Sequence, residues 1–224
     1  MRQFDLHEFL GYIAPGMLLL FGAWFIWPEA QQKFTADSLS FGEFGLGIVV
    51  AYAIGHLIQG LGNLVEKAWW YFWCGMPTDW LRSKKHELIA PAQSDQVEKH
   101  VGTMLSDNLF KLATTQEKHW YSITRQVCAA ILKAESNKKV DIFLAYYGLS
   151  RGIAAVLLFL LVLSLIVHFS AWKIHVVLAA LLVLAIYRMH RFGVIYAREV
   201  FVQFLQIHNT PHEISKASSQ EEIE

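Results

Sequence analysis

Residues 44–65 read FGLGIVVAYAIGHLIQGLGNLV, a run without Asp, Glu, Lys or Arg. A charge-free run of this length is typical of a helix that crosses the roughly 30 Å hydrocarbon core of a bilayer. The run nevertheless carries a histidine, a glutamine and an asparagine, at positions 56, 59 and 63. Polar side chains at that depth are costly in hydrocarbon and usually face other helices or water. The direction in which these three side chains point therefore decides both fold and function.

The rest of the chain is also apolar. Hydrophobic residues make up 54% of its 224 residues, above the roughly 45–50% of ordinary soluble domains. Further apolar segments predict spans at about residues 9–28, 152–169 and 172–188, in addition to the span at 44–65. The last of these is short, but Arg188 can reach the headgroups and Trp172 can anchor the other end. The predicted fold class is an all-α integral membrane protein with four transmembrane helices.

Loop charge predicts the orientation of these spans. Most of the 19 lysines and arginines lie between Asn63 and Ser150, whereas the loops after the first and third spans carry only Lys33 and Lys173. Because basic residues concentrate on the cytoplasmic side, the central segment and both termini are expected in the cytoplasm. Small size and short extracytoplasmic loops favour a bacterial inner membrane.

Four domains follow from this layout. They are an N-terminal transmembrane hairpin (1–74), a cytoplasmic helical domain (75–137) inserted between the second and third spans, a C-terminal transmembrane hairpin with cytoplasmic helix extensions (138–209) and a disordered tail (210–224). The tail has too little apolar content to fold.

The cytoplasmic domain carries helical patterns only. The capping-box sequence TTQE at 114–117 precedes apolar residues at helical spacing, namely Trp120, Ile123, Val127 and Ile131. A second helix is predicted from Ser94 to Leu112, with Val97, Val101 and Leu109 on its apolar face, and a short third helix over 79–88.

The polar residues of the 44–65 span share one side of the predicted helix. Tyr52, His56, Gln59 and Asn63 recur at the alternating four- and three-residue spacing of a heptad seam. One interpretation is that the seam joins helices within one subunit by hydrogen bonds. The other is that several copies of this helix surround an axis, so that the seam lines a conduit.

A strip of small residues, Gly47, Ala51 and Gly55, occupies an adjoining face of the same helix. Such a strip lets another helix approach closely. The first span offers glycines for this contact at positions 11, 16 and 22. It also contains Pro15, which a membrane helix tolerates when a neighbour satisfies the carbonyl that the proline leaves free.

Aromatic residues mark the expected membrane interfaces. Trp69, Trp70 and Trp73 follow the second span, and with Trp172 and Arg188 they are predicted interfacial anchors in contact with membrane lipid. A base-stacking platform for nucleic acid is not expected, because the formal net charge is zero.

The sequence offers no enzymatic signature. It lacks GxSxG, HExxH, GxxxxGK[ST] and GxGxxG motifs. His56 has no metal-ligating residue three or four positions away except Gln59, so neither a metal nor another cofactor is expected. Cys74 and Cys128 are expected to be unpaired thiols in a reducing compartment.

Two functional hypotheses remain. The first is a homo-oligomeric, pore- or channel-like assembly that a cytoplasmic helical domain controls, a class that includes membrane-disrupting defence effectors with a similar outline of short spans and a cytoplasmic sensor. The second is a membrane anchor or scaffold that recruits and senses a soluble cytoplasmic partner protein.

Overall fold

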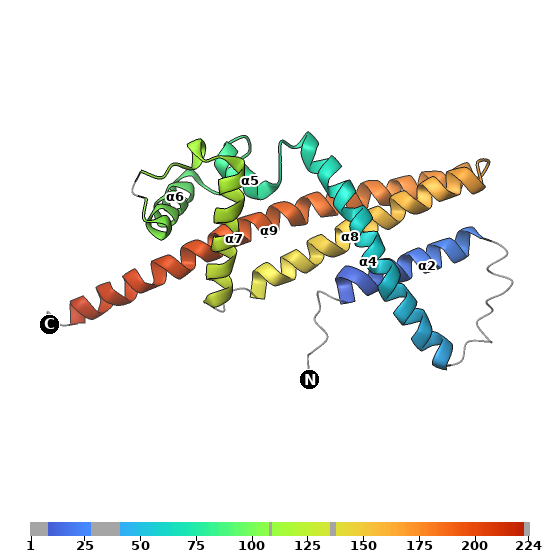
Figure 1. Cartoon of the computed structure of the whole chain (residues 1–224), viewed down its shortest axis with the longest axis horizontal. Coiled ribbons are helices and arrows are strands. Elements are labelled where there is room, and N and C mark those ends of the chain that lie inside the picture. The colour runs from blue at the N-terminus through green and yellow to red at the C-terminus, as the bar shows by residue number, and fades with distance from the viewer. Residues whose placement is uncertain (1–8, 28–40, 108, 135–137, 222–224) are drawn as a thin grey trace. The chain divides into compact units, whose positions relative to one another are not determined.

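The structure is a computed structural model that describes residues 9–27, 41–107, 109–134 and 138–221. Within these residues all regular secondary structure is helical (Figure 1). The elements are the π-helical turn η1 (Phe9–Ile13), α2 (Ala14–Ile26), α4 (Phe41–Phe72), α5 (Pro77–Ser83), α6 (Pro91–Leu105), the 3-10 turn η3 (Leu112–Thr114), α7 (Glu117–Lys133), α8 (Lys138–Val167) and α9 (Trp172–Glu221). The predicted all-α class is confirmed for this part of the chain.

Three helices, α4, α8 and α9, are long and apolar enough to cross a membrane. The apolar helix at the first predicted span, Gly11–Ile26, is shorter. Its regular part, α2, has 13 residues and extends about 20 Å, less than the roughly 30 Å core of a bilayer. Three candidate spans are therefore established by length and composition, and the fourth stays a prediction.

The residues form two compact units. The first unit comprises Met1–Phe72 and Leu144–Phe192, and the second unit comprises Trp73–Phe143 and Gly193–Glu224. Both α8 and α9 contribute residues to each unit. The unit boundaries therefore fall inside two helices, whereas the sequence places its domain boundary before α8.

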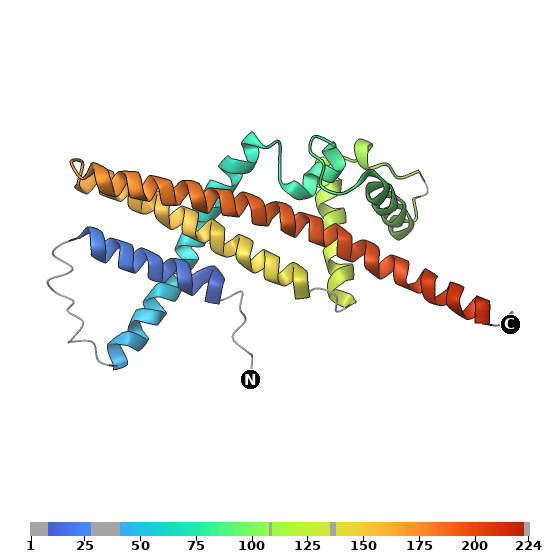
Figure 2. The same cartoon turned by 180° about the vertical axis from the view of Figure 1, so that it is seen from behind.

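In the first unit, α8 and the first part of α9 form an antiparallel hairpin closed by a turn at 168–171. Helix α2 runs beside this hairpin, and α4 crosses it obliquely, as both views show (Figure 1 and Figure 2). Apolar side chains fill the space between these helices, and the buried ones are Ile26, Ile58, Ala155, Val156 and Leu160.

Helices α2 and α4 touch through their backbones. A Cβ atom on Gly16 would collide with the Ala51 carbonyl, and one on Gly55 would collide with the Tyr12 carbonyl. Gly47, the third residue of the predicted small-residue strip, has nothing within 4 Å of a built Cβ. The close crossing therefore needs Gly16 and Gly55 and does not involve Gly47.

The second unit is built around the apolar face of α7. Trp120, Ile123, Val127 and Ile131 are all buried. The Trp120 ring stacks on Phe201 of α9 at 6.0 Å between centroids, and its Nε1 donates to the Thr78 carbonyl at 3.1 Å. A large indole thus joins α7 to two sequence-distant segments.

Two helix boundaries in this unit differ from the prediction. Helix α6 begins at Pro91, because proline fits the first turn of a helix. It ends at Leu105, where Ser106 takes a left-handed conformation (φ 56°) and the Asp107 N–H bonds to the Gly102 carbonyl at 2.9 Å. Leu109, predicted on the apolar face, is 87% exposed. Helix α5 is also shorter than predicted and ends at Ser83.

The end of the chain differs as well. Helix α9 continues to Glu221, through most of the segment predicted to be a disordered tail (210–224). Adding a residue to an existing helix avoids the costly nucleation step, so a long packed helix can extend into a sequence that would not start one.

Candidate functional site

The polar seam of α4 is divided between the interior and the surface of the folded chain. Gln59 is buried, with 8% of its surface exposed. His56 and Asn63 are exposed, and Tyr52 lies at the margin with 37% of its surface exposed. The four predicted residues therefore share one side of the helix but not one environment.

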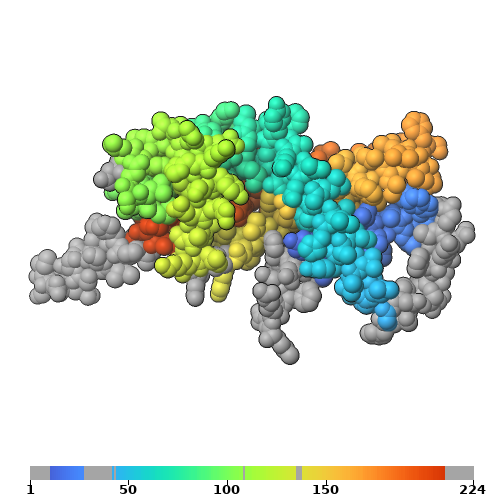
Figure 3. Space-filling view, viewed as in Figure 1, coloured from blue at the N-terminus to red at the C-terminus, as the bar shows by residue number. Residues whose placement is uncertain are grey.

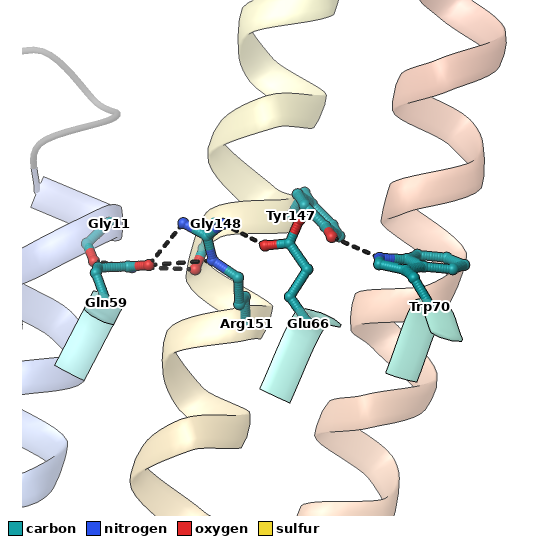
Figure 4. A network of polar contacts seen from close by, with 7 residues as sticks. All are labelled: Gly11, Gln59, Glu66, Trp70, Tyr147, Gly148 and Arg151. Atoms are coloured by element: carbon teal, nitrogen blue, oxygen red, sulfur yellow. Dashed lines mark hydrogen bonds and ion pairs between the residues drawn. The ribbon is translucent and has the colours of Figure 1, made fainter. Parts of the chain in front are cut away.

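The buried part of the seam belongs to a set of polar contacts that we call the polar layer, formed by Gly11, Gln59, Glu66, Trp70, Tyr147, Gly148 and Arg151 (Figure 4). Gln59 Nε2 donates to the carbonyls of Gly11 and Gly148, the latter at 3.3 Å. Arg151 donates to Gln59 Oε1 from Nε at 3.2 Å and from Nη2 at 2.8 Å. Its Nη1 forms an ion pair with Glu66.

Aromatic groups continue this layer towards α9. Trp70, which is 3% exposed, donates its Nε1–H to the Tyr147 hydroxyl at 2.8 Å. The Arg151 guanidinium lies 5.9 Å from the centre of the Tyr147 ring. Trp69 Nε1 donates to Nδ1 of His190 at 3.2 Å. One band of polar contacts thus connects η1, α4, α8 and α9.

Pro15 explains why Gln59 is held at this position. A proline has no N–H for the carbonyl four residues earlier, which here is that of Gly11, and Gln59 donates to that carbonyl. Gly152 makes room, because a Cβ there would lie 2.7 Å from Pro15 Cγ and 3.1 Å from Gln59 Nε2. Pro15, Gln59 and Gly152, which are far apart in the sequence, therefore pack directly against one another.

Two residues of the exposed part of the seam, Tyr52 and His56, form an aromatic cluster with Tyr12. The His56 imidazole stacks on the Tyr12 ring at 4.0 Å between centroids and meets the Tyr52 ring edge-on at 4.7 Å. These contacts order the imidazole on the surface of the folded chain. A ring with this partial cover can present its nitrogens to water or to another chain.

The predicted interfacial anchors lie in different environments. Trp70 and Trp69 belong to the polar layer and its extension. Trp73 packs against the His86 ring in the second unit at 5.8 Å. Trp172 is largely exposed at the start of α9, and the exposed Arg188 lies 5.3 Å from the centre of the Phe192 ring. The exposed side chains of Trp172 and Arg188 are available to lipid headgroups, whereas the buried Trp70 is not.

Three ionisable residues of the polar layer, Glu66, Tyr147 and Arg151, are absent from the predicted site. Glu66 continues the spacing of the seam three residues beyond Asn63, so extending the period past the end of the apolar run would have found it. Trp70, predicted only as an interfacial anchor, follows four residues later. Arg151 carries no comparable signal, because it looks like the residue that ends the charged approach to the third span.

The second unit has two shallow cavities. One of about 210 Å³ is lined by residues that include Trp80, His86 and Asp95, and one of about 300 Å³ includes Glu98 and Lys111. Small-molecule sites usually have volumes of about 300–1,000 Å³ and apolar walls. In the described part of the chain, no group of three or more His, Cys, Asp or Glu side chains is placed to hold a metal ion.

Comparisons with known proteins found no match to this chain. No protein family, no curated protein and no solved structure matches it. The polar layer and the exposed seam, which consists of Tyr52, His56 and Asn63, are therefore the features that bear on function.

Proposed function

We propose that this protein is a four-span membrane protein that assembles as a homo-oligomer, with the exposed seam of α4 lining a pore-like path. The second unit lies in the cytoplasm, with both termini, and controls that path. A bacterial inner membrane is the proposed location, and membrane disruption in defence is one role that this architecture suits.

The observation that carries this proposal is the exposure of His56 and Asn63 in the middle and second half of α4. An imidazole or carboxamide without a partner in hydrocarbon costs roughly 1–3 kcal/mol on protein-based scales. Neighbouring copies or water in a conduit remove this cost. The apolar residues of α4 that are equally exposed, such as Leu57, are compatible with lipid and need no such explanation.

Flux measurements test the pore directly. The full-length protein in liposomes is expected to release an entrapped ion or dye, and His56→Leu or Asn63→Leu should change the rate several-fold while leaving assembly intact. Leu57→Ala is the matched control, because Leu57 adjoins His56 and is 78% exposed. Equal release by all three variants would contradict the pore.

The assembly state provides a second test. We expect cross-linking in detergent to capture a defined oligomer, with residues flanking His56 close to their symmetry mates. A monomer under conditions that retain flux would contradict the proposed assembly.

A membrane anchor for a soluble partner protein is the alternative. It is favoured by large apolar side chains exposed on the second unit, namely Leu109, Tyr121 and Leu132, since exposed apolar groups often mark interaction sites. Tyr121→Ser combined with Leu132→Ser should then abolish co-purification of a soluble protein and leave flux unchanged. Absence of any such protein from the wild-type pull-down counts against the anchor.

A further inference from the structure

Two residues on the same side of α4 hold one residue of α8. Gln59 and Glu66 are one heptad apart, and both bind the guanidinium of Arg151. The two attachment points lie about 10 Å apart along the helix axis. Such a two-point attachment, which we call the Arg151 clamp, fixes the rotation of α4 about its own axis.

The clamp lies next to the exposed seam. At about 100° per residue, Asn63 is displaced by about 40° and His56 by about 60° from Gln59 around the helix. Both are exposed, whereas Gln59 is buried and the Glu66 side chain is 15% exposed. The boundary of the buried surface therefore runs through the polar seam. Gly62 lies about 60° from Gln59 on the side away from His56, so a turn of α4 by about 100° would carry Gln59, Glu66 and Gly62 across this boundary.

At the contact with Arg151, the packing of α4 is compatible with such a turn. Gly62 lies between the two attachment points, and a Cβ there would be 3.2 Å from Arg151 Cγ. The stem of Arg151 thus meets a helix surface without a side chain at this point. A bulky residue would lock α4 against α8 by steric contact, whereas glycine leaves the polar clamp to hold it.

We propose that the Arg151 clamp is the latch that keeps the pore closed, an inference that rests on the proposed pore function. With the clamp formed, Gln59 and Glu66 are used inside the protomer and only His56 and Asn63 face the path. When it opens, α4 turns, and all four polar side chains line a wetter and wider conduit. The hydrogen bonds of Gln59 to Gly11 and Gly148 make the closed arrangement the resting one.

Thiol labelling tests the latch without reference to flux. In the full-length protein with Cys74→Ser and Cys128→Ser, a cysteine introduced by Gly62→Cys is buried and should react slowly with a membrane-impermeant maleimide. Adding Glu66→Lys, which places a second cation beside Arg151, should accelerate labelling at least tenfold, because removing one partner of a buried ion pair is strongly destabilising and a tenfold change needs only about 1.4 kcal/mol. Asn63→Cys, exposed in both states, should label equally with and without Glu66→Lys.

Flux through liposomes is then measured on the same proteins. Glu66→Lys should raise release several-fold, and Glu66→Lys combined with Arg151→Glu should return it towards the wild-type rate by restoring an ion pair of reversed polarity. Lys67→Glu is the control, because it reverses the charge of an exposed neighbour on α4.

The outcomes separate the two proposals. Unchanged labelling of the Gly62→Cys protein by Glu66→Lys overturns the latch, even where His56→Leu still alters release and so supports the pore. Faster labelling that the reversed pair restores supports the latch. If no form of the protein then releases the ion or dye, the clamp still controls α4 and the pore itself is refuted.

Discussion

The two units hold their helices together by different means, although α8 and α9 pass through both. In the first unit glycine contacts and the polar layer join the helices in addition to buried apolar side chains such as Val156 and Leu160. In the second unit they are held by large buried apolar side chains, of which Trp120 and Phe201 have no exposed surface. The polar layer and the close glycine contacts between helices thus distinguish the first unit.

The difference is what two solvents would require. Lipid tails are as apolar as leucine, so membrane helices associate by close packing of small residues and by hydrogen bonds. In water the burial of apolar area is itself the driving force. The contrast is compatible with the proposed membrane environment of the first unit and the proposed aqueous environment of the second. In the space-filling view the green and lime residues of α5, α6 and α7 lie together on the face that is seen, and red atoms of α9 stay visible beside them (Figure 3).

Removing the largest buried ring should have the largest effect. Trp120→Ala should destabilise the second unit by about 3–5 kcal/mol, the usual cost of deleting a buried aromatic side chain. Hydrogen exchange of the full-length protein should show lost protection in α7 with protection of α4 retained. Tyr121→Ala, at an exposed neighbour, is the control. Equal loss in both units would break the distinction between them.

A single methyl group should disrupt the first unit. Gly55→Ala places a Cβ against the Tyr12 carbonyl, and overpacking of this kind costs about 1–3 kcal/mol. Gly47→Ala, on the same helix with open space around it, should be neutral or slightly stabilising, because alanine is the better helix former. Unfolding in mixed micelles by increasing SDS measures both, and identical midpoints would show that the α2–α4 contact is not close.

Loss of one hydrogen bond in the polar layer should have a smaller effect. Tyr147→Phe removes the acceptor for Trp70 Nε1, at an expected cost of about 1 kcal/mol. Tyr146→Phe is the matched control, since Tyr146 packs its ring against Phe192. The same SDS titration applies, and a double-mutant cycle with Trp70→Phe should return a coupling of similar size. Zero coupling would exclude this pair from the forces that hold α4 to α8.

The smallest expected effect is that of mild acid on the stability of the second unit. Burial, together with the nearby His208 charge, lowers the pKa of His100 below its ordinary 6.5. As the pH falls through that ordinary value, the unfolded chain binds the proton more readily, so the stability of the second unit should decrease below about pH 6.5. Hydrogen exchange at pH 7.5 and 5.5 measures the change, and His100→Gln should reduce it. If the second unit were more stable at pH 5.5 than at pH 7.5, the predicted effect of His100 would be wrong.

Local patterns were sufficient for the helices themselves. Apolar runs predicted α4, α8 and the start of α9, and the spacing of Trp120, Ile123, Val127 and Ile131 predicted the buried face of α7. These features depend on composition and on a 3.6-residue period, both of which are properties of a short segment. Helix ends were less predictable, because the left-handed turn at Ser106 has no strong sequence signature.

Tertiary packing alone decides which side chains meet across helices. The heptad period places Gln59, His56 and Asn63 on one side of α4, but it cannot say that Gln59 turns inward to Arg151 and the Gly11 carbonyl while its neighbours stay outside. That choice depends on the oblique crossing of α4 and on the contacts that Gly16, Gly55, Gly62 and Gly152 permit. A period describes one helix, whereas a hydrogen bond between residues 92 positions apart exists only once several helices have packed.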